Sequence, residues 1–379
     1  MNISIETSQL PGPAQRLLGD GAPKPARMMA ARGVMPGLKP GHIVTVLAVL
    51  TSHEDQEVAS TARATLAKLP PPMLNGALQT DLDGGVVHLL AENYATNHDV
   101  MASLLRQPSL RDETLAELAE RADEKLGELV ATNEQRMLRC PAVIEKLYMN
   151  SHVRMSTSDR LIELAVRNGL ELKLAAFKEA AAAIQNELIP EPTEEPTFDD
   201  TVFEEAKQLA QRTQDKIGDG DAFAREEDEE GDETREHVVE DARPLFARIQ
   251  DMTVSQKIRY AMLGNSAARL LLVRDKNRLV AEAAVKSPLM NENDAVRISS
   301  SRMVSEDVLR IIAMNRDLTR SYQVKLNLVQ NPRTPFTFAM RLIPHLRDSD
   351  VRLLARSKQV PSQIRTAARR QISRKEGKH

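Results

Sequence analysis

The residues best suited to binding chemistry are the arginines of the C-terminal third of the chain. Residues 241–379 contain 27 Lys and Arg, of which 20 are Arg, against 12 Asp and Glu. A guanidinium group makes bidentate contacts to phosphate or carboxylate, so these arginines predict an anionic ligand. The candidate binding residues form two groups. Arg297 and Arg341, and likewise Arg310 and Arg352, occupy matched or nearly matched positions in an internal repeat described below. The others lie near the basic C-terminus: Arg365, Arg369, Arg370 and Arg374. The alternative is that such arginines lie on solvated helix faces and pair with neighbouring acids, as in Arg347-Asp348.

No residue pattern predicts catalysis or a metal site. The eight histidines never lie three or four residues from one another, the spacing that places two imidazoles on one helix face. No glycine loop for phosphate and no nucleophile motif occurs. Carboxylate pairs such as Asp112-Glu113 are explained by the favourable charge of a first helical turn. We therefore expect a protein that is not an enzyme, with no catalytic residues, no metal and no cofactor.

The composition favours an all-α fold. Only 3% of the residues are aromatic and Trp is absent, while helix-forming residues abound. The single cysteine, Cys140, cannot form an internal disulfide, which fits a reducing compartment. No stretch of eighteen apolar residues occurs, so we expect a cytoplasmic protein without membrane insertion.

The charge distribution divides the chain into three parts. The net charge is −4 over residues 1–190, −14 over residues 191–240 and +15 over residues 241–379. Like charges repel in the acidic part and little apolar surface collapses there, so it predicts a disordered linker. Within it, Phe203 to Ile217 has helical spacing of apolar residues and predicts either a docked helix or a transient solvated one.

The domain prediction follows this charge map and the prolines and glycines near the N-terminus. It consists of a flexible segment over residues 1–39, an N-terminal helical repeat domain over 40–188, an acidic disordered linker over 189–242, a basic C-terminal helical repeat domain over 243–372, and a basic tail over 373–379.

Internal repetition is clearest in the basic part. The segment from Leu279 to Pro288 matches the segment from Gln323 to Pro332, 44 residues later. A similar pair of segments in the first half lies 46 residues apart. Each unit predicts short helices that bury their apolar faces by stacking in order. We expect Leu279, Val285, Leu309 and Leu342 to lie in the resulting core.

The segment from Leu47 to Leu69 resembles a HEAT unit, and the units around Ser287-Pro288 and Asn331-Pro332 resemble leucine-rich-repeat-variant units. The resemblance to HEAT and armadillo-type repeats implies two α-solenoid segments, joined here by the acidic linker. Such solenoids bind partners along an extended surface. The motif is a packing pattern, so the resemblance implies no catalytic residues.

These observations lead to one expected function and one alternative. The expected function is a scaffold or adaptor that binds protein partners along its helical-repeat surface. The alternative is binding of nucleic acid or another polyanion by the basic repeat domain, with the acidic linker masking the arginines. Few aromatic residues are present to stack on bases, so backbone contacts would dominate such binding.

Overall fold

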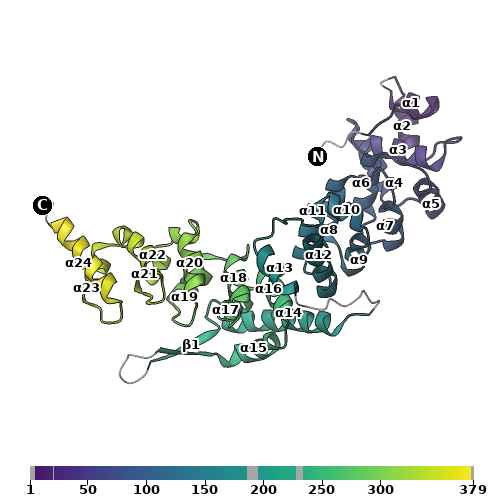
Figure 1. Cartoon of the computed structure of the whole chain (residues 1–379). Coiled ribbons are helices and arrows are strands. Elements are labelled where there is room, and N and C mark those ends of the chain that lie inside the picture. The colour runs from purple at the N-terminus through teal and green to yellow at the C-terminus, as the bar shows by residue number, and fades with distance from the viewer. Residues whose placement is uncertain (1–4, 20, 186–194, 228–233, 377–379) are drawn as a thin grey trace. The chain divides into compact units, whose positions relative to one another are not determined.

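The computed structural model describes residues 5–19, 21–185, 195–227 and 234–376. These residues form 24 α-helices, three 3₁₀ helices and one two-stranded antiparallel sheet, which confirms the all-α prediction (Figure 1). The chain divides into two compact units, unit 1 over Met1–Val153 and unit 2 over Arg154–His379. Among the described helices, none has the length and apolar character needed to cross a membrane.

The helices of unit 1 are short, and all except α8 have a proline in the first turn or a capping Asp or Asn before it. Proline occupies the first turn of α1, α2, α3, α5 and α11, where its missing N–H costs nothing. Side-chain oxygens of Asp or Asn cap α4, α6, α7, α9 and α10. The helices are α1 (Gly12–Leu18), α2 (Lys24–Ala31), α3 (Pro40–Leu50), α4 (Gln56–Leu66), α5 (Pro71–Leu78), α6 (Gly84–Asn93), α7 (His98–Leu104), α8 (Asp112–Arg121), α9 (Glu124–Ala131), α10 (Glu134–Arg139) and α11 (Pro141–Met149).

Unit 2 contains longer helices at both ends and the only strands in the described part of the chain. Its helices are α12 (Met155–Arg167), α13 (Phe177–Ile184), α14 (Phe198–Ile217), α15 (Arg243–Gln250), α16 (Val254–Leu263), α17 (Ser266–Leu272), α18 (Arg278–Lys286), α19 (Glu292–Ser300), α20 (Glu306–Met314), α21 (Tyr322–Gln330), α22 (Phe336–Leu342), α23 (Asp348–Arg356) and α24 (Ser362–Glu376). The strands are β1 (Phe223–Glu227) and β2 (Thr234–Val238), and the 3₁₀ helices are η1 (Glu240–Ala242), η2 (Leu318–Arg320) and η3 (Ile343–His345).

Within each unit, a helix packs mainly on helices that precede or follow it closely. In unit 1, α6 packs on α8 and α8 on α11, while α5 packs on α7 and α7 on α9. In unit 2, α16 packs on α18 and α18 on α20, while α17 packs on α19 and α19 on α21 (Figure 1). Much of each core is therefore built from contacts between neighbouring helices, and in unit 2 contacts between distant parts of the chain add to it.

A polar side chain at the end of one helix bonds the carbonyls at the end of the helix packed beside it. Gln107, Asn150, Ser287 and Asn331 make these bonds, and each is at most 6% exposed. They join α7 to α5, α11 to α8, α18 to α16 and α21 to α19. The bonded residues lie 25 to 32 positions apart, a shorter interval than the 44 to 46 residues of the sequence match.

The Asn331 amide is the clearest of these bonds. Its Nδ2 donates to the carbonyls of Ser299 at 2.9 Å and Ser301 at 2.7 Å. Its Oδ1 accepts from the backbone N–H of Arg333 at 3.0 Å. Asn150 repeats this arrangement in unit 1. Carbonyls at a helix end have no partner within the helix, so these amides supply one.

The prediction of a flexible segment over residues 1–39 is wrong for its described residues. Helices α1 and α2 form there, and they pack on α3 and α4. Ala14, Ala30 and Ala31 are at most 1% exposed. Small side chains let these helices approach closely, so the segment buries enough surface despite its prolines and glycines.

The prediction of a disordered linker over residues 189–242 is also wrong for residues 195–227 and 234–242. These form α14, the β1–β2 hairpin and η1, whereas residues 186–194 and 228–233 lie outside the described part. The expected helix from Phe203 to Ile217 is confirmed as a docked helix and begins earlier, at Phe198. Thr197 and Asp200 form a capping box at its start.

Tyr260 explains why α14 is docked. Its hydroxyl donates to the carbonyl of Ala206 at 2.7 Å, and its ring meets that of Phe203 edge to face at 5.6 Å. The Nδ2 of Asn265 donates to the carbonyl of Ala210 at 2.7 Å. The acidic segment, residues 191–240, therefore has a buried apolar side on α14 that its average composition conceals.

The division between the units differs from the predicted domain boundary. Residues 154–188 were expected in the N-terminal repeat domain, yet α12 and α13 belong to unit 2. Helix α12 packs on α14, and α13 packs on α16 and α18. The buried Glu179 of α13 also pairs with Lys286 of α18. The boundary therefore lies at Val153, before α12 and α13, whereas the sequence predicted a boundary after them, at residue 188.

Two of the four predicted core positions are fully enclosed. Leu309 is 0% exposed and Val285 is 3% exposed. Leu279 and Leu342 are half-buried. Leu342 lies at the edge of a C-terminal cluster that includes Val351, where fewer helices cover it.

We predict that Asn331→Ala destabilises unit 2 by about 1–3 kcal/mol, because two buried carbonyls lose their donor. Urea and thermal unfolding measure the change. Gln330→Ala, which alters the exposed neighbouring amide, is the control and is expected to change the free energy of unfolding little. Equal midpoints for the two variants would contradict this role for Asn331.

We predict that Tyr260 causes the free energy of unfolding of unit 2 to fall as the pH rises above about 10. Burial raises the pKa of Tyr260 in the folded chain. As the pH rises past the pKa of an unfolded tyrosine, the unfolded state loses a proton that the folded state keeps, so the free energy of unfolding falls. Tyr260→Phe is expected to reduce this fall by up to about 1.4 kcal/mol per pH unit. Urea unfolding between pH 8 and pH 11 measures both slopes, and identical slopes would refute the prediction.

Candidate functional site

A groove with an apolar part and an arginine part lies at the C-terminal end of unit 2. Its volume is about 950 Å³. Helix α22 and η3 contribute Phe336, Met340 and Pro344, and α24 contributes polar and basic side chains. Phe336 is 44% exposed and Met340 is 37% exposed. Large apolar side chains exposed beside a groove are typical of interaction surfaces.

Three of the eight predicted arginines line this groove. Arg369, Arg370 and Arg374 lie on α24, and Arg370 and Arg374 are four positions apart, a spacing that places two side chains on the same face of a helix. The Nε of Arg369 donates to the carbonyl of Ala355 at 3.3 Å, which fixes its direction. Arg365 is half-buried on the same helix.

Buried apolar side chains hold α24 against the preceding helices. Ile364 and Ala368 are at most 2% exposed and belong to a cluster with Val351 and Leu354 of α23. Because Ile364 and Ala368 are four positions apart, they fix one face of α24 against the core. The remaining face presents the basic side chains to the groove.

The other predicted arginines lie on other helices. Arg297 is on α19, Arg310 on α20, Arg341 on α22 and Arg352 on α23. Arg341 and Arg352 are exposed. None of these four is among the residues that line the groove.

Arg297 and Arg310 interact with acidic or carbonyl groups of the protein itself. The Nη2 of Arg310 lies 2.7 Å from Oδ1 of Asp307. Arg297 lies 4.0 Å from Asp294 and donates to the carbonyl of Asp219 in the acidic segment. At these two positions the structure follows the alternative of internal pairing that the sequence left open.

Arg274, which is not among the predicted arginines, holds the β1–β2 hairpin in place. Its side chain is 4% exposed. It lies 3.1 Å from Asp221 and 3.1 Å from Glu236, and its guanidinium stacks over the ring of Phe223 at 4.2 Å. Glu236 also accepts from the hydroxyl of Ser301 at 2.7 Å. Arg274 has no matched position in the repeat comparison, so only the three-dimensional contact identifies it.

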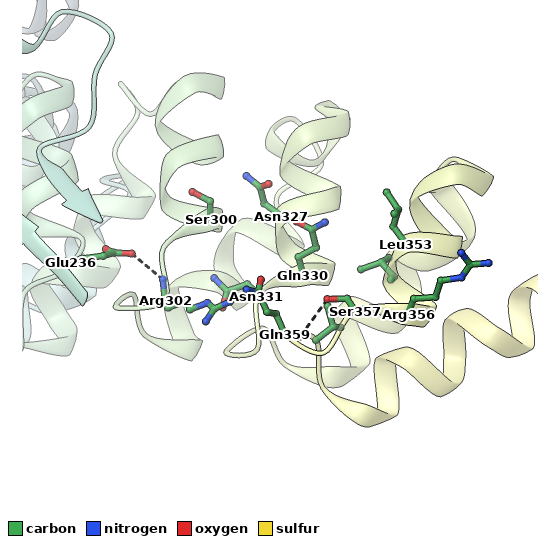
Figure 2. Close-up of a pocket in the computed structure, with 12 residues that line it drawn as sticks. Glu236, Ser300, Arg302, Asn327, Gln330, Asn331, Leu353, Arg356, Ser357 and Gln359 are labelled. Atoms are coloured by element: carbon green, nitrogen blue, oxygen red, sulfur yellow. Dashed lines mark hydrogen bonds between the residues drawn. The ribbon is translucent and has the colours of Figure 1, made fainter. Parts of the chain in front are cut away.

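A second cavity of about 580 Å³ borders this hairpin. Figure 2 shows Glu236 at one end, next to Arg302, and Arg356 at the other. A carboxylate oxygen of Glu236 accepts from the backbone N–H of Arg302 at 3.1 Å. The amide of Asn327 in its wall donates to the carbonyl of Val296 at 2.9 Å. These polar groups already serve internal bonds, so they hold neighbouring helices together.

Among the described residues, one group has the donor atoms for a metal ion, and it lies in unit 1. It consists of His88, Glu92 and Glu117. The absence of histidine pairs does not reveal this group, because it combines a histidine with a glutamate four positions further along the helix. A search for mixed pairs of this kind would have found His88 and Glu92.

No known family model matches the chain, and no curated protein matches it.

We predict that Glu236→Gln loosens the hairpin and destabilises unit 2 by about 3–5 kcal/mol, because Arg274 then loses a buried charged partner. Hydrogen exchange and limited proteolysis of residues 223–238, with urea unfolding, measure the effect. Glu240→Gln removes the same charge from an exposed position in η1 and is the control. Equal protection of the hairpin in both variants would contradict the role of Glu236.

Proposed function

We propose that the protein is a non-catalytic adaptor that binds an acidic, amphipathic segment of a partner protein in the groove between α22 and α24. The observation that carries the proposal is the juxtaposition of Phe336 and Met340 with Arg370 and Arg374 in one groove. An amphipathic helix binds a groove through its apolar face. Carboxylates at the margin of such a helix would pair with the arginines.

The apolar part of the groove favours a protein partner over a nucleic acid. A nucleic-acid backbone needs a continuous series of cations, and its affinity comes from released counterions. Arg297 and Arg310 are engaged with groups of the chain itself, which interrupts such a series. Exposed Phe336 and Met340 would contribute little to phosphate contacts but would bury apolar side chains of a protein segment.

The packing of successive short helices supports a repeat architecture. We infer that each unit is a short α-solenoid of the HEAT-like or leucine-rich-repeat-variant kind, which stabilises itself through neighbouring repeats. The single Cys140 fits action in a reducing compartment such as the cytoplasm. In this proposal the acidic segment neutralises Arg274 and Arg297, while none of its described residues lines the groove.

The proposal is tested by placing a photo-crosslinking amino acid at Met340 in the full-length chain. We expect crosslinks to acidic segments whose apolar residues recur at helical spacing. Arg370→Glu is expected to lower the crosslink yield about tenfold, as loss of a charge-assisted bond of about 1.5–3 kcal/mol implies. Mass spectrometry of the crosslinked peptides identifies the bound segment.

Arg316→Glu is the matched control because it makes the same charge change at an exposed position on the loop after α20. Its crosslink yield is expected to equal that of the unaltered chain. Crosslinks to nucleic acid, with binding that weakens steeply as salt rises, would replace the proposal by its polyanion alternative. Equal yields from the two charge variants would refute the role of the arginine part of the groove.

A further inference from the structure

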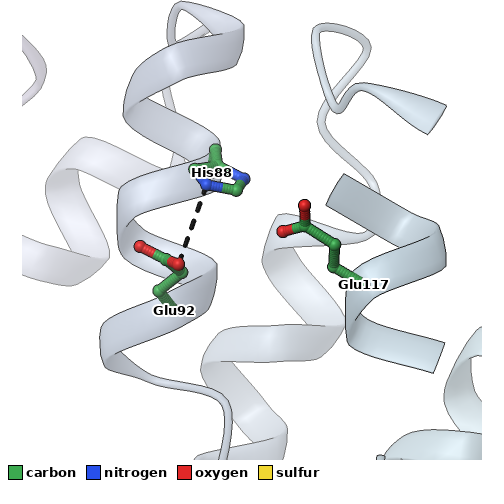
Figure 3. A group of neighbouring side chains, drawn as sticks. All are labelled: His88, Glu92 and Glu117. Atoms are coloured by element: carbon green, nitrogen blue, oxygen red, sulfur yellow. Dashed lines mark ion pairs between the residues drawn. The ribbon is translucent and has the colours of Figure 1, made fainter. Parts of the chain in front are cut away.

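Three side chains that commonly bind metals meet between two helices of unit 1. His88 and Glu92 lie one turn apart on α6, and Glu117 lies on α8, which packs beside α6. One donor atom from each side chain lies within 4.8 Å of the other two. Figure 3 shows the carboxylate of Glu117 facing the imidazole of His88 across the space between the helices.

The orientation of His88 is fixed by a second residue of α8. Its Nδ1 lies 2.9 Å from the hydroxyl oxygen of Thr114. With Nδ1–H donating to that hydroxyl, Nε2 carries the lone pair and faces the carboxylates. Metal-binding histidines typically donate their second ring N–H to an oxygen in this way, which fixes the tautomer and the ring orientation.

On the other side of the ring, Nε2 faces the carboxylate of Glu92. The nearest atom with which it pairs is Oε1 of Glu92, at 3.8 Å, beyond hydrogen-bonding distance. The His88 side chain is only 10% exposed. In this tautomer the Nε2 lone pair and the two carboxylates are all electron-rich, and a cation between the three groups offsets their mutual repulsion.

The space between these groups is a small cavity of about 140 Å³. Thr114, Glu117 and Arg121 line it together with His88 and Glu92. A water molecule takes about 30 Å³ of liquid volume, so the cavity has room for an ion and bound water. Glu92 is exposed and Glu117 is half-buried, so both side chains have the freedom to move closer to an ion.

We propose that His88, Glu92 and Glu117 bind a divalent transition-metal ion, with Zn²⁺ as the best match to the donor set. One imidazole and two carboxylates supply three ligands, and zinc accepts both ligand types. The ligand distances of about 2.0–2.2 Å require the two carboxylates to close on the imidazole. The fourth position faces the cavity and takes water. The ion joins α6 to α8.

Arg121 provides an internal check on this proposal. It follows Glu117 by four positions on α8, is exposed, and lines the same cavity. Its positive charge opposes a cation and attracts the same carboxylates. Removal of this charge in Arg121→Gln therefore strengthens metal binding, whereas a site remote from this cavity does not respond to it.

The test is calorimetric titration of the full-length chain, without a histidine tag, with ZnCl₂ alone, and titration with CoCl₂ followed by visible absorption. The expected result is one ion per chain with a tetrahedral Co²⁺ spectrum. Glu117→Gln is expected to weaken binding at least tenfold, and Thr114→Val is expected to weaken it about tenfold through loss of the imidazole orientation. Both variants alter the surroundings of His88 while retaining its imidazole.

Two controls separate this site from other zinc-binding groups. Glu113→Gln removes an exposed carboxylate from the same helix, and His98→Gln removes the imidazole that pairs with Asp123 at 2.8 Å. Both are expected to leave the affinity unchanged. Absence of stoichiometric binding, or equal affinity in Glu117→Gln and Glu113→Gln, would overturn the proposal. A loss of binding confined to His98→Gln would assign the metal to His98 and Asp123 instead.

Discussion

The ends of short helices impose the main constraint on this structure. Most of its helices have fewer than twelve residues, and every helix leaves four N–H groups and four carbonyls without partners inside the helix. A chain of many short helices therefore has an unusually large share of such groups. Capping Asp, Asn, Ser and Thr residues serve the first turns. Buried amides such as Asn150 and Asn331 serve the last ones and join each helix to its neighbour.

The positive charge of unit 2 has two distinct uses. One is structural: Arg269 is 3% exposed and pairs with the fully buried Asp294 at 2.7 Å, and Arg274 fixes the acidic hairpin. Arg269 also donates to the carbonyl of Gly264 at 2.7 Å. Such arginines act inside the fold, where their fork geometry satisfies several acceptors at once. The other is the proposed binding of a partner segment by Arg370 and Arg374, which line a groove on the exposed face of α24. Net charge alone does not separate these uses.

The sequence predicts what depends on local periodicity and misses what depends on distant contacts. Helical spacing identified α14 and the buried position of Leu309. The average charge of the acidic segment suggested disorder because the aromatic and amide partners of α14, Tyr260 and Asn265, lie more than fifty residues further along the chain. The matched segments of α18 and α21 lie 44 residues apart, whereas the buried side-chain bonds to helix-end carbonyls span 25 to 32 residues, so the sequence match does not identify the bonded neighbours. Arg370 and Arg374 were found because a basic run on one helix is a local signal.

The two candidate binding sites belong to different units, and this separation follows from the local character of the packing. His88 and Glu117 join α6 to α8 in unit 1, while the groove lies on α22 and α24 in unit 2. Within each unit, the side-chain bonds to helix-end carbonyls span 25 to 32 residues, so a change at one helix acts first on its immediate neighbours. Stability in such an arrangement is a sum of helix terms and neighbour terms. A metal ion between α6 and α8 therefore stabilises the neighbouring helices of unit 1, and the groove of unit 2 depends on the cluster of Val351, Leu354 and Ile364 beneath α24.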